Sequence, residues 1–354
     1  MRKRPFSLQL WFISFLMLFA ILLSACGAPA NAQPVAPAAK TSPPGSTQNS
    51  SQTGSQSLKV AALFSQKISG SAWDKNAYDG LQLIQNQLGA QTAYTENVQV
   101  PDIENTLRNY ANKGYQLIFG NGFEYGDPTI AIAKNLPNTD FVVITGNVEA
   151  SNVQSVDFAQ HELGYVIGVL AGLMTKSNKI GVVAGQAYPS VIRYTEGIKL
   201  GAKAANPDAQ VTVVFINSWT DAQKGQEAAR AMVENGSDIL IHKADAVGQA
   251  VIKVAQEAQI YAIGDGPGQE ELAPDTVLTS GLSSTPELML YVAKSVQDGS
   301  FKGGQTTPGF AAGVLSLAPF NEAVPSDVQT KVNQTIDQIK SGALKVPEVT
   351  SITK

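Results

Sequence analysis

Short apolar runs alternate with segments of helical periodicity along most of the chain. The first run is KVAALF at 59–64, and the helical spacing that follows it stops at Gly89. Similar runs, each followed by a helical stretch, are YQLIFG, KIGVVAG, VTVVFI, DILIH and IYAIG. Short β-rich runs that alternate with helices are typical of parallel sheets built from βαβ units. The pattern therefore predicts an α/β protein.

This alternation occurs twice, once before and once after about residue 157, which predicts two αβ lobes. Loops at the carboxyl ends of parallel strands are the favoured ligand site in open α/β sheets. The apolar stretch 158–174 includes Gln160, His161 and Glu162 and is short for a membrane span. A buried helix at the boundary between the lobes is therefore predicted there.

The N-terminal residues have the features of an export signal. A basic segment, MRKR, precedes the apolar run 8–23, and LSAC then contains Cys26, the chain's only cysteine. We expect residues 1–25 to be a lipoprotein signal peptide and Cys26 to be lipidated after cleavage. An ordinary signal peptide with an incidental cysteine and an uncleaved anchor helix are the alternatives. Residues 26–56 are rich in Pro, Ala, Ser and Gln, and this composition predicts a disordered tether. The predicted location is the extracytoplasmic face of the cell membrane.

Composition argues against several classes of protein. The net charge of −4 disfavours nucleic-acid binding, and one cysteine leaves no disulfide framework. With two histidines and no HExxH, GxSxG or GxxxxGK[ST] motif, the sequence predicts no catalytic, metal or cofactor site. A secreted hydrolase is therefore the weaker alternative to a binding protein.

Aromatic and polar residues gather where the predicted strands end. Aromatic faces that clamp a flat ring, with carboxylates at its edge, would form a small-molecule site. The candidate ligand-binding residues are Trp73, Asp74, Phe123, Trp219, His242, Asp245, Gly264 and Asp265.

Structural roles are the alternative for individual members of this set. Trp73 and Phe123 are also compatible with core packing, and His242 with a wall position at a strand end. Asp74 is also suited to the N-terminal end of a helix, and Asp221, outside the set, predicts a helix N-cap.

Several motifs together resemble the basic membrane lipoprotein family, related to purine nucleoside receptors. They include WDKNAYDGL, YQLIFGNGF, HELGYVIGVLAGLM, NSWTDAQKGQEAARAM and IDQIKSGALKVP, and the resemblance covers residues 58–348. It implies a type I periplasmic-binding fold with two lobes joined by three crossovers. The implied lobes are 57–157 with 285–313, and 158–284 with 314–354. An ABC permease is the implied partner, and no enzymatic activity is expected.

The resemblance also implies a ligand class, since the family binds purine nucleosides and, in one branch, nucleobases. Trp73 stands where the family has a stacking phenylalanine, and Asp74 where an asparagine reads the base edge. Four positions where the family has an acid or a lysine hold other residues here: Ser69, Gly70, Gly268 and Ser283. Their loss removes partners for ribose hydroxyls and favours a purine nucleobase over a nucleoside. A sugar ligand and a sensory lipoprotein without a transporter are the alternatives.

Overall fold

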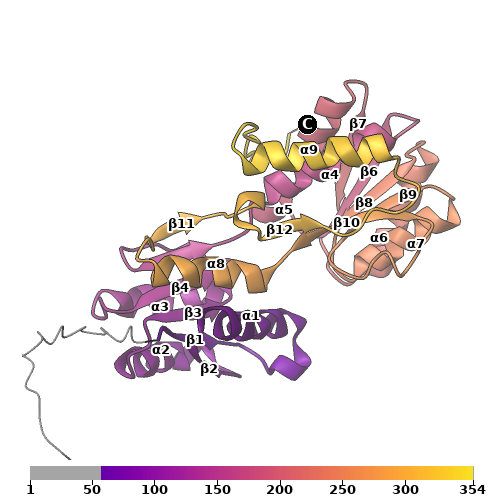
Figure 1. The fold of residues 1–354 in the computed structure, drawn as a ribbon. Helices are drawn as coiled ribbons and strands as arrows, with labels where there is room; N and C mark the ends of the chain where they lie inside the picture. Colours follow the sequence, from indigo (N-terminus) through magenta and orange to yellow (C-terminus); the bar gives the residue numbers. More distant parts are fainter. Residues whose placement is uncertain (1–56, 354) are drawn as a thin grey trace, which may run out of the picture. The chain divides into compact units, whose positions relative to one another are not determined.

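The computed structural model describes residues 57–353, which contain two sheets of six strands each (Figure 1). The first sheet has the order β11-β5-β4-β3-β1-β2 and is parallel throughout. Its strands are β1 (Lys59–Leu63), β2 (Gln91–Thr95), β3 (Leu117–Asn121), β4 (Asp140–Ile144), β5 (Val153–Val156) and β11 (Gly304–Thr306).

The second sheet has the order β12-β10-β9-β8-β6-β7, with β12 as its one antiparallel strand. Its strands are β6 (Lys179–Ala184), β7 (Gln210–Phe215), β8 (Ile239–Lys243), β9 (Tyr261–Asp265), β10 (Val277–Ser283) and β12 (Leu315–Leu317). The predicted α/β class with mostly parallel sheets is confirmed.

Helices cover both faces of each sheet, which explains the nearly continuous apolar runs of the strands. In β1, Val60 and Ala62 belong to the core that includes α1 and α8, whereas Ala61 and Leu63 belong to the core that includes α2 and α3. The helices beside the first sheet are α1 (Ala72–Leu88), α2 (Ile103–Asn112), α3 (Gly126–Ala133) and α8 (Thr285–Gln297), with α1 and α8 side by side (Figure 1).

The second sheet has α6 (Ala222–Glu234) and α7 (Val247–Glu257) in one core and α4 and α5 in the other. Helix α4 (Gln160–Met174) is mostly buried, which confirms the prediction of a buried helix in this stretch. It packs against α5 (Pro189–Ala205) and α9 (Ser326–Lys340).

Glycines bring α4 and α5 into unusually close contact. A Cβ atom at Gly164 would lie 2.1 Å from the carbonyl oxygen of Tyr194, and one at Gly201 would lie 2.0 Å from that of Tyr165. Gly168 and Gly197 face the partner helix in the same way. The two helices therefore touch through their backbones, with no room for side chains at these points.

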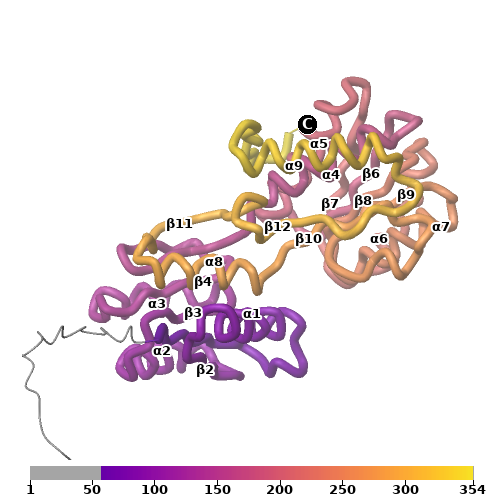
Figure 2. The backbone as a smooth tube through the Cα atoms, viewed as in Figure 1, coloured from indigo at the N-terminus to yellow at the C-terminus, as the bar shows by residue number. Residues whose placement is uncertain are grey.

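The chain passes between the two sheets three times, as can be followed in Figure 2. The passages are 157–159 before α4, Ser284 before α8, and 307–314 between β11 and β12. Residues in and directly beside these passages are hydrogen-bonded: Gln160 Nε2 donates to Ser283 Oγ at 3.2 Å, and the Phe310 amide donates to Glu162 Oε2 at 3.0 Å. The three crossovers implied by the resemblance are therefore present.

An ion pair lies at the first crossover. Arg193 of α5 donates to Asp157 Oδ2 at 2.7 Å, and its Nε lies 3.5 Å from Glu348 Oε1. Burial raises the pKa of Asp157, although the Phe158 amide and Arg193 act in the opposite direction. The crossover is thus held to α5 by a partly buried charge contact.

Asp140, the first residue of β4, leads to a prediction about pH. Burial raises the pKa of its carboxyl group to about 6. The folded state then binds a proton more tightly than the unfolded state, so stability is lost as the pH rises from about 4 to 6. Asp140→Asn should be more stable than the wild type by about 1 kcal/mol at pH 7.5, allowing for solvent screening, and equal to it at pH 3.5.

Urea unfolding across this pH range measures the difference. Asp208→Asn, the same substitution at an exposed position, is the control and should show no such divergence. A constant difference between Asp140→Asn and wild type at all pH values would contradict the assignment.

Candidate functional site

Three residues from the first sheet and α1 are bonded together at the carboxyl end of β3. Trp73 Nε1 donates to the backbone carbonyl of Asn121 at 3.1 Å, and Asn121 Nδ2 donates to Asp74 Oδ1 at 2.8 Å. Asn121 is the last residue of β3, and Trp73 and Asp74 lie in the first turn of α1. The structure therefore joins Trp73 and Asp74 of α1 to Asn121 at the end of β3.

The Asp74 carboxylate is fully buried and is used inside the protein. Its second oxygen accepts from the Gln66 amide at 3.1 Å, and the Asp74 amide donates to Oγ of the N-cap residue Ser71. Asp74 thus holds the β1–α1 loop and the Asn121 amide in place. Asn121 Oδ1 is buried and has no protein partner among the described residues.

Phe123 and Trp73 are the exposed aromatic residues beside this network. Gly122 has φ 151°, and Phe123 follows it at the start of a short 3-10 turn, Phe123–Tyr125. Phe123 is 75% exposed and Trp73 40%, whereas Tyr125 is buried. Burial and the charges of Glu124 and Asp74 raise the pKa of Tyr125. Phe123 is therefore available to a ligand, and the packing alternative for it is not supported.

The second sheet carries an aromatic pair at its own carboxyl end. Trp219 lies against Gly185, where an added Cβ atom would be 2.4 Å from Trp219 Cε3. The Tyr188 ring centroid is 6.0 Å from that of Trp219, with the planes tilted by 47°. Tyr188 is also strongly exposed. Both rings thus stand beside the end of β6.

A charged pair ends the two neighbouring strands β8 and β9. Lys243 Nζ donates to Asp265 Oδ1 at 2.7 Å and lies 4.9 Å from the centroid of the Tyr194 ring. Burial and the Asp265 charge raise the pKa of Tyr194, so the phenol stays neutral. The Lys243 carbonyl accepts from the Gly185 amide at 2.9 Å, so Lys243 ends its strand beside the end of β6.

His242 and Gly264 lie behind this pair, in the interior. Burial lowers the pKa of His242, and its neutral ring has Nε2 2.6 Å from Gln269 Oε1 and packs on Gly248 of α7. Gln269 Nε2 in turn donates to the Asp265 carbonyl at 2.9 Å. Gly264 is buried against Ser280. The wall interpretation of His242 accordingly agrees with the structure, which gives it a supporting position behind Asp265.

Asp245 and Asp221 lie outside these groups. Asp245 is exposed in the β8–α7 loop, with φ 48°, and its carbonyl accepts from the Gly248 amide. Asp221 Oδ1 accepts from the Lys224 amide at 3.1 Å, which confirms the predicted N-cap of α6. Asp245 is thus not hydrogen-bonded to the other candidates.

Sequence reasoning missed Asn121 and Tyr188 and left Lys243 out of the candidate set. Asn121 and Lys243 are the last residues of their strands, a position that could have identified them. Tyr188 precedes a proline at the start of α5, where no sequence signal distinguished it from a loop aromatic.

No metal site accompanies these residues: within residues 57–353, no group of three or more His, Cys, Asp or Glu side chains is arranged to hold an ion. The same part of the chain has no helix with the length and apolarity needed to span a bilayer. The predicted signal peptide, the lipidation at Cys26 and the tether lie outside the described residues.

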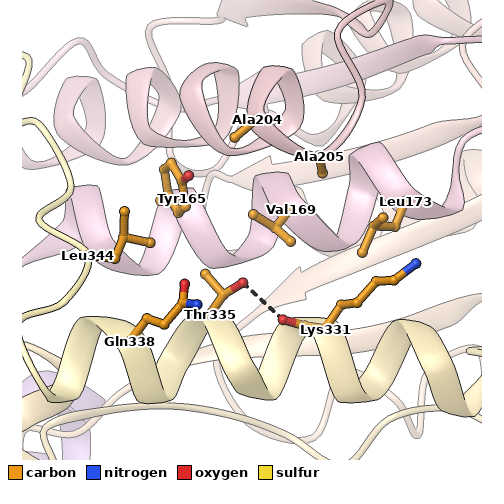
Figure 3. A pocket seen from close by; sticks show the side chains of 9 residues that line it. All are labelled: Tyr165, Val169, Leu173, Ala204, Ala205, Lys331, Thr335, Gln338 and Leu344. Atoms are coloured by element: carbon orange, nitrogen blue, oxygen red, sulfur yellow. Dashed lines mark hydrogen bonds between the residues drawn. The ribbon is translucent and has the colours of Figure 1, made fainter.

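A cavity of about 400 Å³ lies between α4, α5 and α9 (Figure 3). Tyr165 and Val169 of α4 face Lys331 and Thr335 of α9, and Thr335 Oγ1 donates to the Lys331 carbonyl at 2.9 Å. Its walls are these three helices and Leu344 of the segment after α9, and no strand end contributes to them. This cavity is therefore separate from the strand-end residues.

Comparison with known proteins identifies relatives along the described part of the chain. The family described as ABC transporter substrate-binding protein PnrA-like matches residues 57–350. A purine-binding protein of Brucella abortus is 32% identical over 292 residues, covering 82% of this chain and 83% of the relative. An ABC transporter nucleoside-binding protein of Lactococcus lactis is 30% identical over 303 residues, covering 79% and 86%.

The fold also matches solved structures. A solute-binding protein of an ABC transporter system from Conexibacter woesei superposes with a TM-score of 0.65 at 25% identity, covering 82% of this chain and 99% of that one. The predicted type I periplasmic-binding fold is confirmed.

Proposed function

Because the chain belongs to the PnrA-like family of ABC transporter substrate-binding proteins, we propose that its own ligand is a purine nucleobase. The observation that carries this proposal is the presence of exposed aromatic rings beside fixed polar groups at the carboxyl ends of both sheets. Relatives named for purine and nucleoside binding support the same ligand class.

In this proposal the rings supply most of the binding free energy. Trp73 and Phe123 from the first sheet and Trp219 from the second stack on the faces of the base. Stacking of a base on an aromatic side chain contributes about 1–3 kcal/mol. The Trp73 ring is held in a fixed direction by its hydrogen bond to the Asn121 carbonyl, so less entropy is lost when it stacks.

Polar groups read the edge of the base. Asn121 Oδ1 and the Asp265 carboxylate accept from ring or exocyclic N–H groups. Asp74 acts through Asn121, since both of its oxygens are already bonded. Asp245, which is exposed, joins the ligand only when the site closes.

A free base fits the site better than a nucleoside. Ribose hydroxyls need charged or amide partners when they are buried, and unpaired ones cost about 1–3 kcal/mol each. Where the resemblance places such partners, this chain has Ser69, Gly70, Gly268 and Ser283. These residues lack the acid or ammonium groups that would bind a sugar.

Capture works by closure of two lobes around the base. The lobes are 57–157 with 285–313, and 158–284 with 314–354, and the bonded crossovers act as the hinge. Since each lobe contributes contacts to one ligand, binding favours the closed form, which an ABC permease then recognises. No step of this cycle needs a catalytic group, so the protein is not an enzyme.

The membrane attachment rests on sequence alone. Cys26 follows a basic and apolar segment that ends in small residues, which favours lipidation at the extracytoplasmic face. Residues 27–56 then link the anchor to the binding domain.

A thermal-shift titration of the full chain with adenine, hypoxanthine, adenosine and glucose tests the ligand class. A base at about 100 times its dissociation constant adds about 2.7 kcal/mol of stability, which is readily detected. Stabilisation by bases and not by adenosine is expected. Stabilisation by glucose alone, or by no purine compound, would overturn the proposal.

Trp219→Ala should weaken base binding about 10-fold, within the range for loss of one stacking contact. Tyr291→Ala, at a 41% exposed aromatic residue on α8, is the matched control and should leave the affinity unchanged. Calorimetric titration with the base that binds most tightly measures the dissociation constants of the wild type and both variants. Equal affinities for Trp219→Ala and wild type would remove Trp219 from the site.

A further inference from the structure

Lys243 occupies a distinctive place in the second sheet. It is the last residue of β8, and its carbonyl accepts from the Gly185 amide on β6. Gly185 is also the residue on which the Trp219 ring rests. Lys243 therefore ends the strand next to β6, at the carboxyl edge of the sheet to which the proposed function assigns the ligand.

The position of the ammonium group is fixed from two sides. Asp265 Oδ1 accepts from Nζ at 2.7 Å, and the buried Tyr194 ring lies 4.9 Å from it. Asp265 ends the adjacent parallel strand β9, and Gln269 bonds its carbonyl. An ammonium has three N–H donors and no acceptor, and the bond to Asp265 uses one of them.

The pair is also partly open to solvent. The Lys243 and Asp265 side chains are 16% and 19% exposed. The remaining N–H donors of Lys243 are thus accessible to a ligand. Because the ammonium is partly desolvated, a hydrogen bond that it donates is stronger than the same bond in water.

We propose that Lys243 selects a 6-oxopurine over a 6-aminopurine, with Asp265 orienting it. This inference rests on the proposed function. A 6-oxopurine presents two adjacent acceptors, O6 and N7, to a cationic donor, whereas adenine presents N7 beside an amino donor. Opposite adenine, the ammonium would face the N–H groups of the amino substituent, and it has no acceptor with which to bind them. Asp265, next to Lys243, accepts from a ring N–H of the same base.

A purely structural role for the ion pair predicts a different result. Loss of the lysine would then lower stability and weaken every ligand alike. Selection between bases, in contrast, changes the ratio of two dissociation constants, and a general loss of stability does not move that ratio.

The test measures dissociation constants of the full chain for hypoxanthine and adenine by calorimetry, in the wild type and Lys243→Met. The wild type should prefer hypoxanthine by about 10-fold, equal to about 1.4 kcal/mol. Lys243→Met should lose this preference while its affinity for adenine changes by less than about 3-fold, and Lys243→Arg should restore a preference for the oxo base.

Lys199→Met is the matched control. Lys199 also donates to a carboxylate, that of Glu196 at 2.8 Å, and is 24% exposed, but it lies on α5 beside Thr353 and not at a strand end. It should keep the wild-type ratio. A wild type that binds both bases equally or prefers adenine, or a Lys243→Met variant with an unchanged ratio, overturns the inference. A wild type that binds neither base refutes the proposed function itself.

Discussion

Gly201→Ala should destabilise the protein by about 3 kcal/mol, at the upper end of the range for overpacking in a core. The new Cβ atom would lie 2.0 Å from the Tyr165 carbonyl oxygen and 2.8 Å from its carbon. Backbone atoms cannot move aside as a flexible side chain can, so α4 and α5 must separate along their contact. Urea unfolding monitored by circular dichroism measures the loss.

The sign of this effect is informative, because alanine is the better helix former by about 1 kcal/mol. Gly70→Ala is the control: an added Cβ atom there meets nothing within 4 Å, and the residue has no positive φ. A stabilised Gly201→Ala variant would show that the helices do not pack as described.

Asp74→Ala should cost about 3 kcal/mol of folding stability, because it removes the acceptor of two hydrogen bonds in a fully buried position. Asn121 Nδ2 would be left without its partner, at about 1–3 kcal/mol for an unsatisfied buried group, and the amide of the exposed Gln66 would lose a hydrogen bond worth about 1 kcal/mol. Asp74→Asn keeps one acceptor oxygen and should cost less. Thermal unfolding followed by calorimetry separates the three proteins.

Asp79→Ala provides the comparison on the same helix. The Asp79 side chain is 43% exposed and, among the described residues, bonds only to Lys75, so its loss should change the stability by less than about 0.5 kcal/mol. Equal losses for the Asp74→Ala and Asp79→Ala variants would mean that the buried network contributes nothing.

The architecture was predictable because the apolar runs are local signals. Strands β1 and β6 are buried on both faces, and such strands read as continuous apolar segments whatever their neighbours are. The buried helix α4 was also predictable, since Gln160, His161 and Glu162 are clustered at its beginning. Pairing order and crossovers depend on distant contacts, and for these the family resemblance was needed.

The positions of the candidate residues were predictable, but their bonding partners were not. Loops that follow parallel strands lie at one edge of their sheet, so Trp73 could be expected beside the first sheet, and Trp219 and Asp265 beside the second. The partners of a carboxylate cannot be read in this way. Asp74 bonds to Asn121, 47 residues away along the chain, only because β3 lies next to β1.

The backbone contact between α4 and α5 has a mechanical consequence. Because α4 and α5 touch through their backbones, they cannot slide or roll on one another, and we expect them to move as one rigid unit. Helix α4 begins directly after the first crossover. Arg193 of α5 forms an ion pair with Asp157 of that crossover. Any rotation of one lobe against the other must therefore be absorbed by the torsion angles of the three crossovers, and the segment 157–159 is the one that leads directly into this rigid pair of helices.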